Sequence, residues 1–210
     1  MNLLRLDASI LPTTSSSAQL ADLAEAEWHA AHPTSTITRR HLATDPLPAE
    51  AWALAATAGF TPEAERTAEQ ADALRLAADL AAELQHADAV LLAVPLYNFG
   101  VSQHVKTWID LIIAGAGPTN PVLAETPTAL ITTLGGGYGP GTPREGWDHA
   151  TPYLRRILGE MWQAELTVIT RELTRAASDP AMEGLRDLAD QQHANAQAAA
   201  RAAGKVLAGR

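Results

Sequence analysis

The chain has 210 residues, 47% of them apolar and 19% charged, so it can bury a core and is expected to form one domain over residues 1–210. The formal net charge of −9 argues against a nucleic-acid partner, and the lack of cysteine excludes disulfides, thiolate nucleophiles and cysteine-ligated metals. The N-terminus lacks the pattern of a signal peptide and no run of about 18 apolar residues occurs, which excludes a membrane-spanning helix and leaves a cytoplasmic protein as the expectation.

Short apolar runs typical of strands alternate with helical patterns along the chain. Residues 3–6 predict a first strand, and residues 18–30 keep a helical period. Further strands are predicted at 34–43, 88–95, 126–137 and 164–173, and further helices at 63–85, 103–113, 151–162 and 181–207. Residues 46–70 contain three prolines, which limit any long helix, so we expect this segment to be largely irregular.

The helix at 103–113 is apolar nearly all round, which is typical either of deep packing or of a subunit interface. Strands that alternate with helices favour a parallel sheet covered on both faces. Ligands of such sheets bind at the carboxyl ends of the strands. Three loops then become candidates for a site: residues 8–18, 95–101 and 132–141.

The first loop is rich in hydroxyl groups. Ser9 is followed by five consecutive hydroxyl residues, 13–17, at the start of a helix. A helix N-terminus offers free N–H groups and partial positive charge, which suit a phosphate. One hydroxyl residue is also the ordinary cap of a helix, but a single cap does not need five. The pattern favours phosphate binding, and it is not a Walker loop because no Gly-Lys-Ser/Thr ends it.

The second loop, "PLYNFG" at 95–100, ends an apolar strand in an aromatic residue, an amide and a glycine. These groups suit contact with a planar ring, and they suit a tight turn equally well. The third loop, "TTLGGGYGPG", has five glycines between Gly135 and Gly141. Its glycines permit close approach of a ligand or simple flexibility, and their spacing is not that of a dinucleotide-binding fingerprint.

In order along the chain, these motifs resemble the FMN-dependent NADH-azoreductases. The stretch "VPLYNFGVSQHVKTWIDLI" is similar to the family's Pro-Met-Tyr-Asn-Phe motif and the Lys-x-Trp-Ile-Asp that follows it. "SILPTTSSS" resembles its phosphate loop, "TTLGGGY" its Ser-Arg-Gly-Gly loop, and "TPYLRRILG" its Thr-Pro-Tyr-Leu helix. The resemblance implies a flavodoxin-like α/β sandwich of three layers, with a five-stranded parallel sheet in the order 2-1-3-4-5 and helices on both faces.

Carried over by position, the resemblance also implies the residues of an FMN site. They are Ser9, Ser15, Ser16 and Ser17 at the phosphate, Leu96, Tyr97, Asn98 and Phe99 along the isoalloxazine ring, and Thr133, Leu134, Gly135 and Gly136 at its polar edge. No acid–base residue and no metal ligand is assigned. Members of the family are homodimers with active sites at the subunit interface, and the same is expected here, without a nucleic-acid or membrane partner.

The implied activity is transfer of two electrons from NADH or NADPH, by a ping-pong hydride mechanism on FMN, to quinones or aromatic azo compounds. The chain departs from the family pattern in a shorter segment after Gly115, in Leu134 where a polar or basic residue is usual, and in "LGEMWQA". These departures indicate a more open pocket. Two alternative functions therefore remain open: a dedicated flavoenzyme for a polycyclic aromatic or quinone intermediate of a biosynthetic pathway, and a non-catalytic flavodoxin-like electron carrier.

Overall fold

Five parallel strands form one sheet in the order β2-β1-β3-β4-β5, which confirms the expected flavodoxin-like topology. The computed structural model describes residues 1–209. The strands are β1 (Asn2–Asp7), β2 (Thr36–His41), β3 (Ala89–Ala93), β4 (Pro127–Thr133) and β5 (Glu165–Arg171). The helices are α1 (Ser16–Ala31), α2 (Ala51–Ala58), α3 (Ala68–Gln85), α4 (Gln103–Ala116), α5 (Thr151–Arg155) and α6 (Arg186–Leu207). Three short segments accompany them: the 3-10 helices η1 (Glu63–Glu65) and η3 (Pro180–Leu185), and the π-helical η2 (Arg156–Met161).

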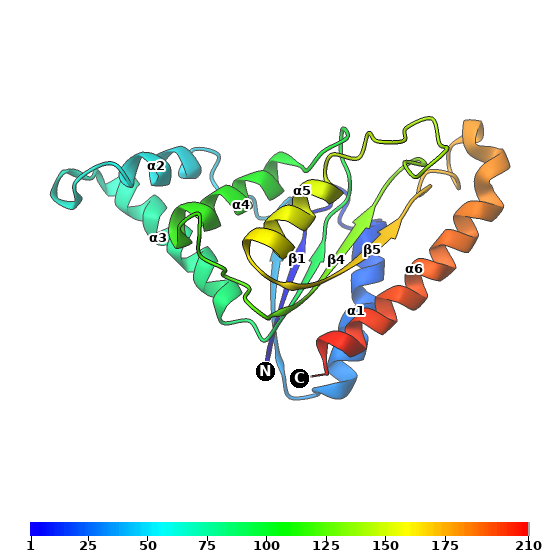
Figure 1. Ribbon diagram of the computed structural model, residues 1–210, viewed down its shortest axis with the longest axis horizontal. Coiled ribbons are helices and arrows are strands. Elements are labelled where there is room, and N and C mark those ends of the chain that lie inside the picture. Colours follow the sequence, from blue (N-terminus) through cyan, green and yellow to red (C-terminus); the bar gives the residue numbers. More distant parts are fainter. Residues whose placement is uncertain (210) are drawn as a thin grey trace.

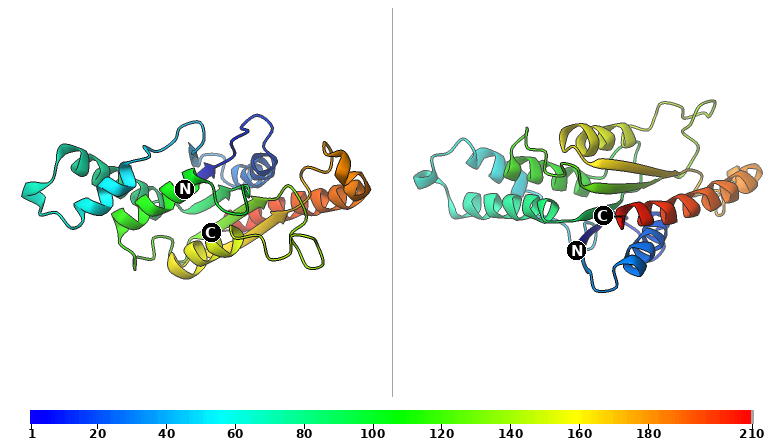
Figure 2. Two further views of the ribbon diagram at one scale, coloured as in Figure 1. Left: turned by 90° about the horizontal axis from the view of Figure 1, so that it is seen from above. Right: turned by 60° about the horizontal axis from the view of Figure 1, so that its bottom comes forward.

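Helices α1 and α6 lie side by side on one face of the sheet (Figures 1 and 2). Leu20 and the ring of Trp28 on α1 are buried against apolar residues of β1, β3 and β4. Ala24 of α1 meets the small residues Ala200 and Gly204 of α6. These small side chains let the two helices approach closely enough to share one core with the sheet.

The other face carries α3 and α4, with α2 outside them and α5 beside them (Figure 1). Leu111 and Ile112 of α4 are fully buried, and the ring of Trp108 packs edge-on against Trp162 at 5.7 Å. The apolar surface of α4 is therefore covered largely by its own chain. Of the two alternatives for this helix, deep packing or a subunit interface, deep packing within the chain accounts for most of its apolar residues.

Four boundary predictions are wrong, each for a local reason. Residues 46–70 contain α2, which fits between Pro48 and Pro62 and buries Ala51 and Ala55. The predicted helix at 63–85 begins only at Ala68, where a capping box stops it from extending backwards. Residues 181–185 form a 3-10 turn ahead of α6, and the predicted helix at 151–162 changes from α to π geometry after five residues.

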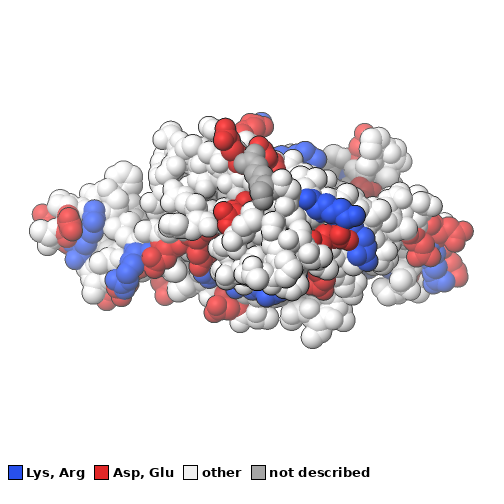
Figure 3. Space-filling model, turned by 90° about the horizontal axis from the view of Figure 1, so that it is seen from below, with Lys and Arg blue, Asp and Glu red and all other residues white. Residues whose placement is uncertain are grey.

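The strands run with their carboxyl ends toward the top of Figure 1, away from both termini. On the opposite side, viewed from below, acidic and basic side chains are scattered in small groups with no continuous basic surface (Figure 3). Within residues 1–209, none of the helices combines the length and the apolar character needed to cross a membrane.

The close approach of α1 and α6 gives a stability test. A Cβ added at Gly204 would lie 2.3 Å from the carbonyl oxygen of Ala24, so Gly204→Ala must push the two helices apart. We expect the free energy of unfolding in urea to fall by about 1–3 kcal/mol. Gly184→Ala is the control, because a Cβ there meets nothing within 4 Å. Equal stability of the two variants would contradict this packing.

Candidate active site

The carboxyl ends of β1, β3 and β4 lie next to one another, and the loops that follow them surround a cleft of about 430 Å³. The cleft brings together seven of the residues predicted for the site: Ser9, Ser15, Ser16, Leu96, Tyr97, Thr133 and Gly135. The three loops singled out in the sequence therefore meet at one place, the switch point of the sheet between β1 and β3.

The hydroxyl-rich loop ends in the first turn of α1. The Ser15 side chain accepts a hydrogen bond from the amide of Ala18 at 3.1 Å and lies 3.1 Å from the Ser17 hydroxyl. The first N–H groups of a helix have no acceptor inside the helix, and Ser15 caps only one of them. Ser16 and Ser17 precede the capped amide in this first turn, and the Ser17 hydroxyl is buried and already engaged.

Tyr97 joins the second loop to the first. Its hydroxyl oxygen accepts the Ile10 amide at 3.1 Å and lies 3.4 Å from the Ser9 hydroxyl. The Ser9 hydroxyl in turn accepts the amide of Leu11 at 3.2 Å. The sequence predicts a ring contact for Tyr97, which stays a prediction; what the structure shows is that the Tyr97 hydroxyl orders the loop that holds Ser9.

Residues 97–100 are a tight turn as well as part of the cleft. Tyr97 and Gly100 exchange two backbone hydrogen bonds, at 3.2 and 2.9 Å, around Asn98 and Phe99. Both central residues have positive φ, 47° for Asn98 and 68° for Phe99. Asparagine tolerates this conformation, whereas for phenylalanine it costs about 1–2 kcal/mol. The surrounding structure holds this strained turn with both side chains exposed at its tip.

The third loop is tied to the loop after β5. The amides of Leu173, Thr174 and Arg175 donate to the carbonyls of Gly136, Leu134 and Gly135, at 3.1–3.2 Å. Leu134 is only 1% exposed, so its side chain belongs to the interior and does not line the cleft. Gly136 is buried against the guanidinium of Arg144, which a Cβ there would approach to 2.6 Å.

A further group of lining residues, from the segment after β5, is not predicted from the sequence. Thr174, Arg175 and Ser178 follow β5 and line the cleft opposite the first loop. Arg175 is the one charged side chain among the lining residues that the structure describes, and it pairs with Asp179 at 2.9 Å. No local motif marks these residues, because their place depends on the pairing of β5 with β4.

Aromatic side chains gather beside the turn. The ring of Phe99 lies 5.4 Å from that of Trp147, edge-on, and 6.4 Å from that of Tyr138. The amide of His149 donates to the Phe99 carbonyl at 2.9 Å, which ties the long segment after β4 to the second loop. Trp147 is 51% exposed and Phe99 39% exposed, so this aromatic group stands open to solvent at the mouth of the site.

A second cleft, of about 320 Å³, shares Thr174 with the first and lies where β5 meets α6. Its charged lining residues are Arg171, Arg186 and Asp190. Burial lowers the pKa of the Arg171 guanidinium, against the opposing effect of Asp190. This cleft includes the first turns of α6, but it lacks the serine-rich turn of α1 and the loops after β1, β3 and β4 that surround the first cleft.

Comparison with known proteins gives the family. Residues 1–206 match the family model described as the flavodoxin-like fold. The chain is 39% identical over 205 residues to an FMN-dependent NADH:quinone oxidoreductase of Frankia casuarinae, covering 95% of this chain and 97% of the relative. The chain belongs to the flavodoxin-like family that includes these FMN-dependent NADH:quinone oxidoreductases.

Other members and structures are similar over nearly the whole chain. An FMN-dependent NADH:quinone oxidoreductase of Streptomyces avermitilis is 39% identical over 212 residues, 99% of this chain and 97% of that relative. The crystal structure of an FMN-dependent NADH-azoreductase from Bacillus anthracis in complex with FMN superposes with a TM-score of 0.74, at 17% identity, over 96% of this chain and 99% of that one. At that identity, the structural likeness shows the shared fold.

The bond from Tyr97 to the first loop in this family member can be tested directly. Tyr97→Phe removes the acceptor of the Ile10 amide, so hydrogen exchange at residues 9–11 is expected to quicken by about tenfold, and the free energy of unfolding to fall by about 0.5–1.5 kcal/mol. Tyr138→Phe is the control, since it removes a hydroxyl from the neighbouring loop without touching Ile10. Unchanged exchange at residues 9–11 in Tyr97→Phe would show that the hydroxyl does not order this loop.

Proposed function

We propose that the chain is a single-domain FMN-dependent NAD(P)H oxidoreductase that acts on quinones or aromatic azo compounds. The observation that carries this proposal is the convergence of a serine-rich helix N-terminus with the loops after β3 and β4 around one cleft. The names of its relatives, FMN-dependent NADH:quinone oxidoreductases at 39% identity, support the same activity.

The phosphate end of FMN fits the first turn of α1. The free amides of Ser16 and Ser17 and the hydroxyls of Ser9 and Ser16 offer donors, and the helix end adds partial positive charge. Arg175 also lines the cleft, where its guanidinium is paired with Asp179. This donor set suits a phosphate dianion held mainly by neutral groups. Ser15 and the Ser17 hydroxyl keep the turn in shape from inside.

The ring end fits the second and third loops. Pro95, Leu96 and Tyr97 form one side of the cleft, and Thr133 and Gly135 form another. Gly135 lines the cleft with the Arg175 side chain packed where a Cβ would lie. Leu134 contributes no side chain to the cleft, and its amide and carbonyl are paired with Arg171 and Thr174. Asn98 and Phe99 stand at the rim, where they would meet the outer part of the ring or the second substrate.

FMN bound at this cleft would supply the redox chemistry, namely acceptance of a hydride from the nicotinamide and delivery of two electrons to an acceptor. The chain binds and orients both partners, and no side chain is needed as an acid or base for the hydride step. Donor and acceptor would use the same open side of the cleft in turn, as a ping-pong order requires. The exposed rings of Phe99 and Trp147 offer a stacking surface for flat aromatic molecules.

We also infer a homodimer with the active site at the subunit interface and a cytoplasmic location, where NADH and NADPH are made available. The exposed aromatic group at the mouth of the cleft supports the dimer, because a second copy would shield it from water. Light scattering on the purified protein tests the assembly: a mass of one chain at micromolar concentration would contradict it.

The activity is tested on protein reconstituted with FMN under anaerobic conditions. We expect the flavin absorbance to bleach when NADH or NADPH is added and to return when a quinone or an azo dye follows. Bleaching that no quinone or azo dye reverses would instead support a dedicated aromatic substrate. A protein that neither binds FMN nor is bleached by either donor would contradict the proposal.

Two substitutions of Asn98 test the proposed ring contact. Together they separate the effect of losing the side-chain amide from the effect of straining the turn. Asn98→Ala loses the amide and also places alanine at positive φ, at a cost of about 1 kcal/mol. Asn98→Gly loses only the amide, because glycine adopts this φ freely. We expect FMN to bind about tenfold more weakly to Asn98→Ala, and several-fold more weakly to Asn98→Gly, in a fluorescence titration. Wild-type affinity in both variants would rule out the amide contact.

A further inference from the structure

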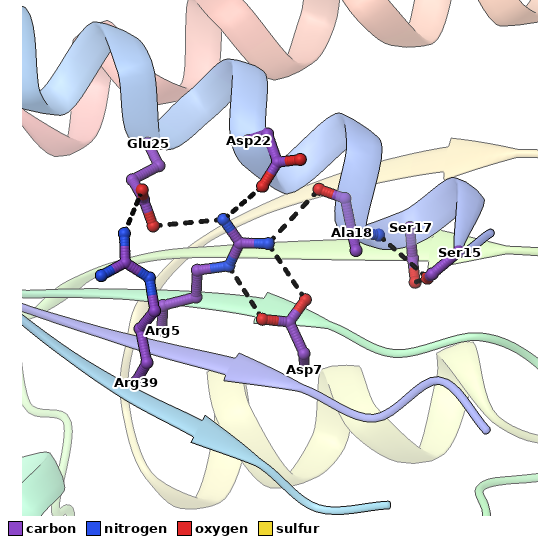
Figure 4. A network of polar contacts seen from close by, with 8 residues as sticks. All are labelled: Arg5, Asp7, Ser15, Ser17, Ala18, Asp22, Glu25 and Arg39. Atoms are coloured by element: carbon purple, nitrogen blue, oxygen red, sulfur yellow. Dashed lines mark hydrogen bonds and ion pairs between the residues drawn. The ribbon is translucent and has the colours of Figure 1, made fainter. Parts of the chain in front are cut away.

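A cluster of charges built on the buried Arg5 and Asp7 lies between β1 and α1, behind the first loop (Figure 4). The Arg5 guanidinium donates to both oxygens of Asp7, at 2.8 and 3.2 Å. It also donates to Asp22 at 2.6 Å and to Glu25 at 3.1 Å, both on α1. Glu25 is shared with Arg39 of β2. One arginine thus meets three carboxylates where the sheet and the helix would otherwise pack through apolar side chains.

Arg5 is 6% exposed and Asp7 8% exposed, so neither group is there for solubility. Burial alone lowers the pKa of Arg5, but the hydrogen bonds and charges of Asp7 and Asp22 outweigh it, and the pKa lies above its ordinary value. Arg5 therefore stays charged throughout the physiological range. Buried ion clusters of this kind are weak contributors to stability, since desolvation offsets much of the attraction. The place of this cluster in the fold is therefore more informative about its role than its contribution to stability.

Hydrogen bonds connect the cluster to the first turn of α1. Arg5 donates to the carbonyl of Ala18 at 3.4 Å, and the amide of Ala18 is the one that Ser15 caps. Asp7 is the last residue of β1, two positions before Ser9. The carboxylate of Asp7 thus lies at the base of the loop that carries the proposed phosphate donors. Left unpaired, it would repel a phosphate dianion.

We propose that Arg5 is a positioning residue for the cofactor phosphate: it offsets the charge of the Asp7 carboxylate behind the first loop and fixes the first turn of α1, so that neutral donors can hold a dianion there. This inference rests on the proposed function, because it concerns the same FMN site. Arg5 acts through Asp7 and Ala18 and does not touch the ligand. Its effect is confined to the phosphate, so it should change the preference for FMN over riboflavin, which has the same ring without the phosphate.

The test compares the affinities of FMN and riboflavin, measured by fluorescence titration of the cofactor-free protein. For Arg5→Gln we expect the ratio of FMN to riboflavin affinity to fall by about tenfold, the effect of roughly one uncompensated charge near a dianion. Arg40→Gln is the matched control: Arg40 lies on β2 and pairs with Glu83 of α3, on the other face of the sheet. It loses a comparable ion pair and should keep the wild-type ratio.

Two further variants separate charge from structure. Asp7→Asn removes the carboxylate and leaves Arg5 in place, so the FMN preference should rise above wild type. Arg5→Gln combined with Asp7→Asn removes both charges and should return the preference to near the wild-type value. A purely structural role for Arg5 would weaken both ligands alike and would not be reversed by the second substitution. If Arg5→Gln does not fold, Asp7→Asn decides, and an unchanged or lower FMN preference in it overturns the proposal.

The outcomes distinguish this inference from the proposed function. A wild-type protein that binds riboflavin as tightly as FMN has no phosphate site, and the proposed function fails at that point. A wild-type protein that prefers FMN, together with an Arg5→Gln variant that keeps the full preference, overturns the role of Arg5 alone.

Discussion

The reversal of strand order at β1 is the constraint on which the site depends. From β1 the chain crosses by α1 to β2 at the edge, and then returns past β1 to β3. Because the crossovers are made on opposite faces, α1 and α3 diverge, and a crevice opens beyond the carboxyl ends of β1 and β3 (Figure 1). The loops after β1, β3 and β4 that enter the crevice are each anchored by a buried parallel strand. The position of the site is thus a consequence of topology before any individual residue is considered.

The chemistry at that crevice uses neutral donors in place of lysines and arginines. Hydroxyls and helix amides face the cleft at the first loop, and the arginine nearest to them in sequence, Arg5, points inward to carboxylates. The one charged side chain that lines the described cleft, Arg175, comes from the far end of the sheet. In a chain with a net charge of −9, the proposed arrangement would give local affinity for a phosphate without a general attraction for polyanions.

Local patterns in the sequence were sufficient for much of the fold. The buried strand at 88–95 and the helix after "PLYNFG" can be predicted because their apolar residues follow a simple period. The three loops could be selected because topology rules place ligands at strand ends. The short helix α2 is missed because the prolines, which limit a long helix, leave room for eight helical residues between Pro48 and Pro62.

The rest of the site depends on contacts between residues far apart in the chain. Nothing near Tyr97 in sequence indicates that its hydroxyl will meet Ile10, and nothing near Arg5 indicates Glu25 as its partner. The choice between a turn and a ligand contact at residues 97–100 also had a non-local answer: the turn is real, and its strain is held by the loops around it. Leu134 resembled a ring contact by position, yet its side chain belongs to the core.

The most direct test of the central claim is a crystal structure of the protein grown with FMN. The account predicts density for the phosphate at the first turn of α1, within hydrogen-bonding distance of the Ser16 and Ser17 amides, and the ring against residues 95–99 and 133–135. A flavin whose phosphate lies in the second cleft, beside Arg171 and Arg186, would contradict it.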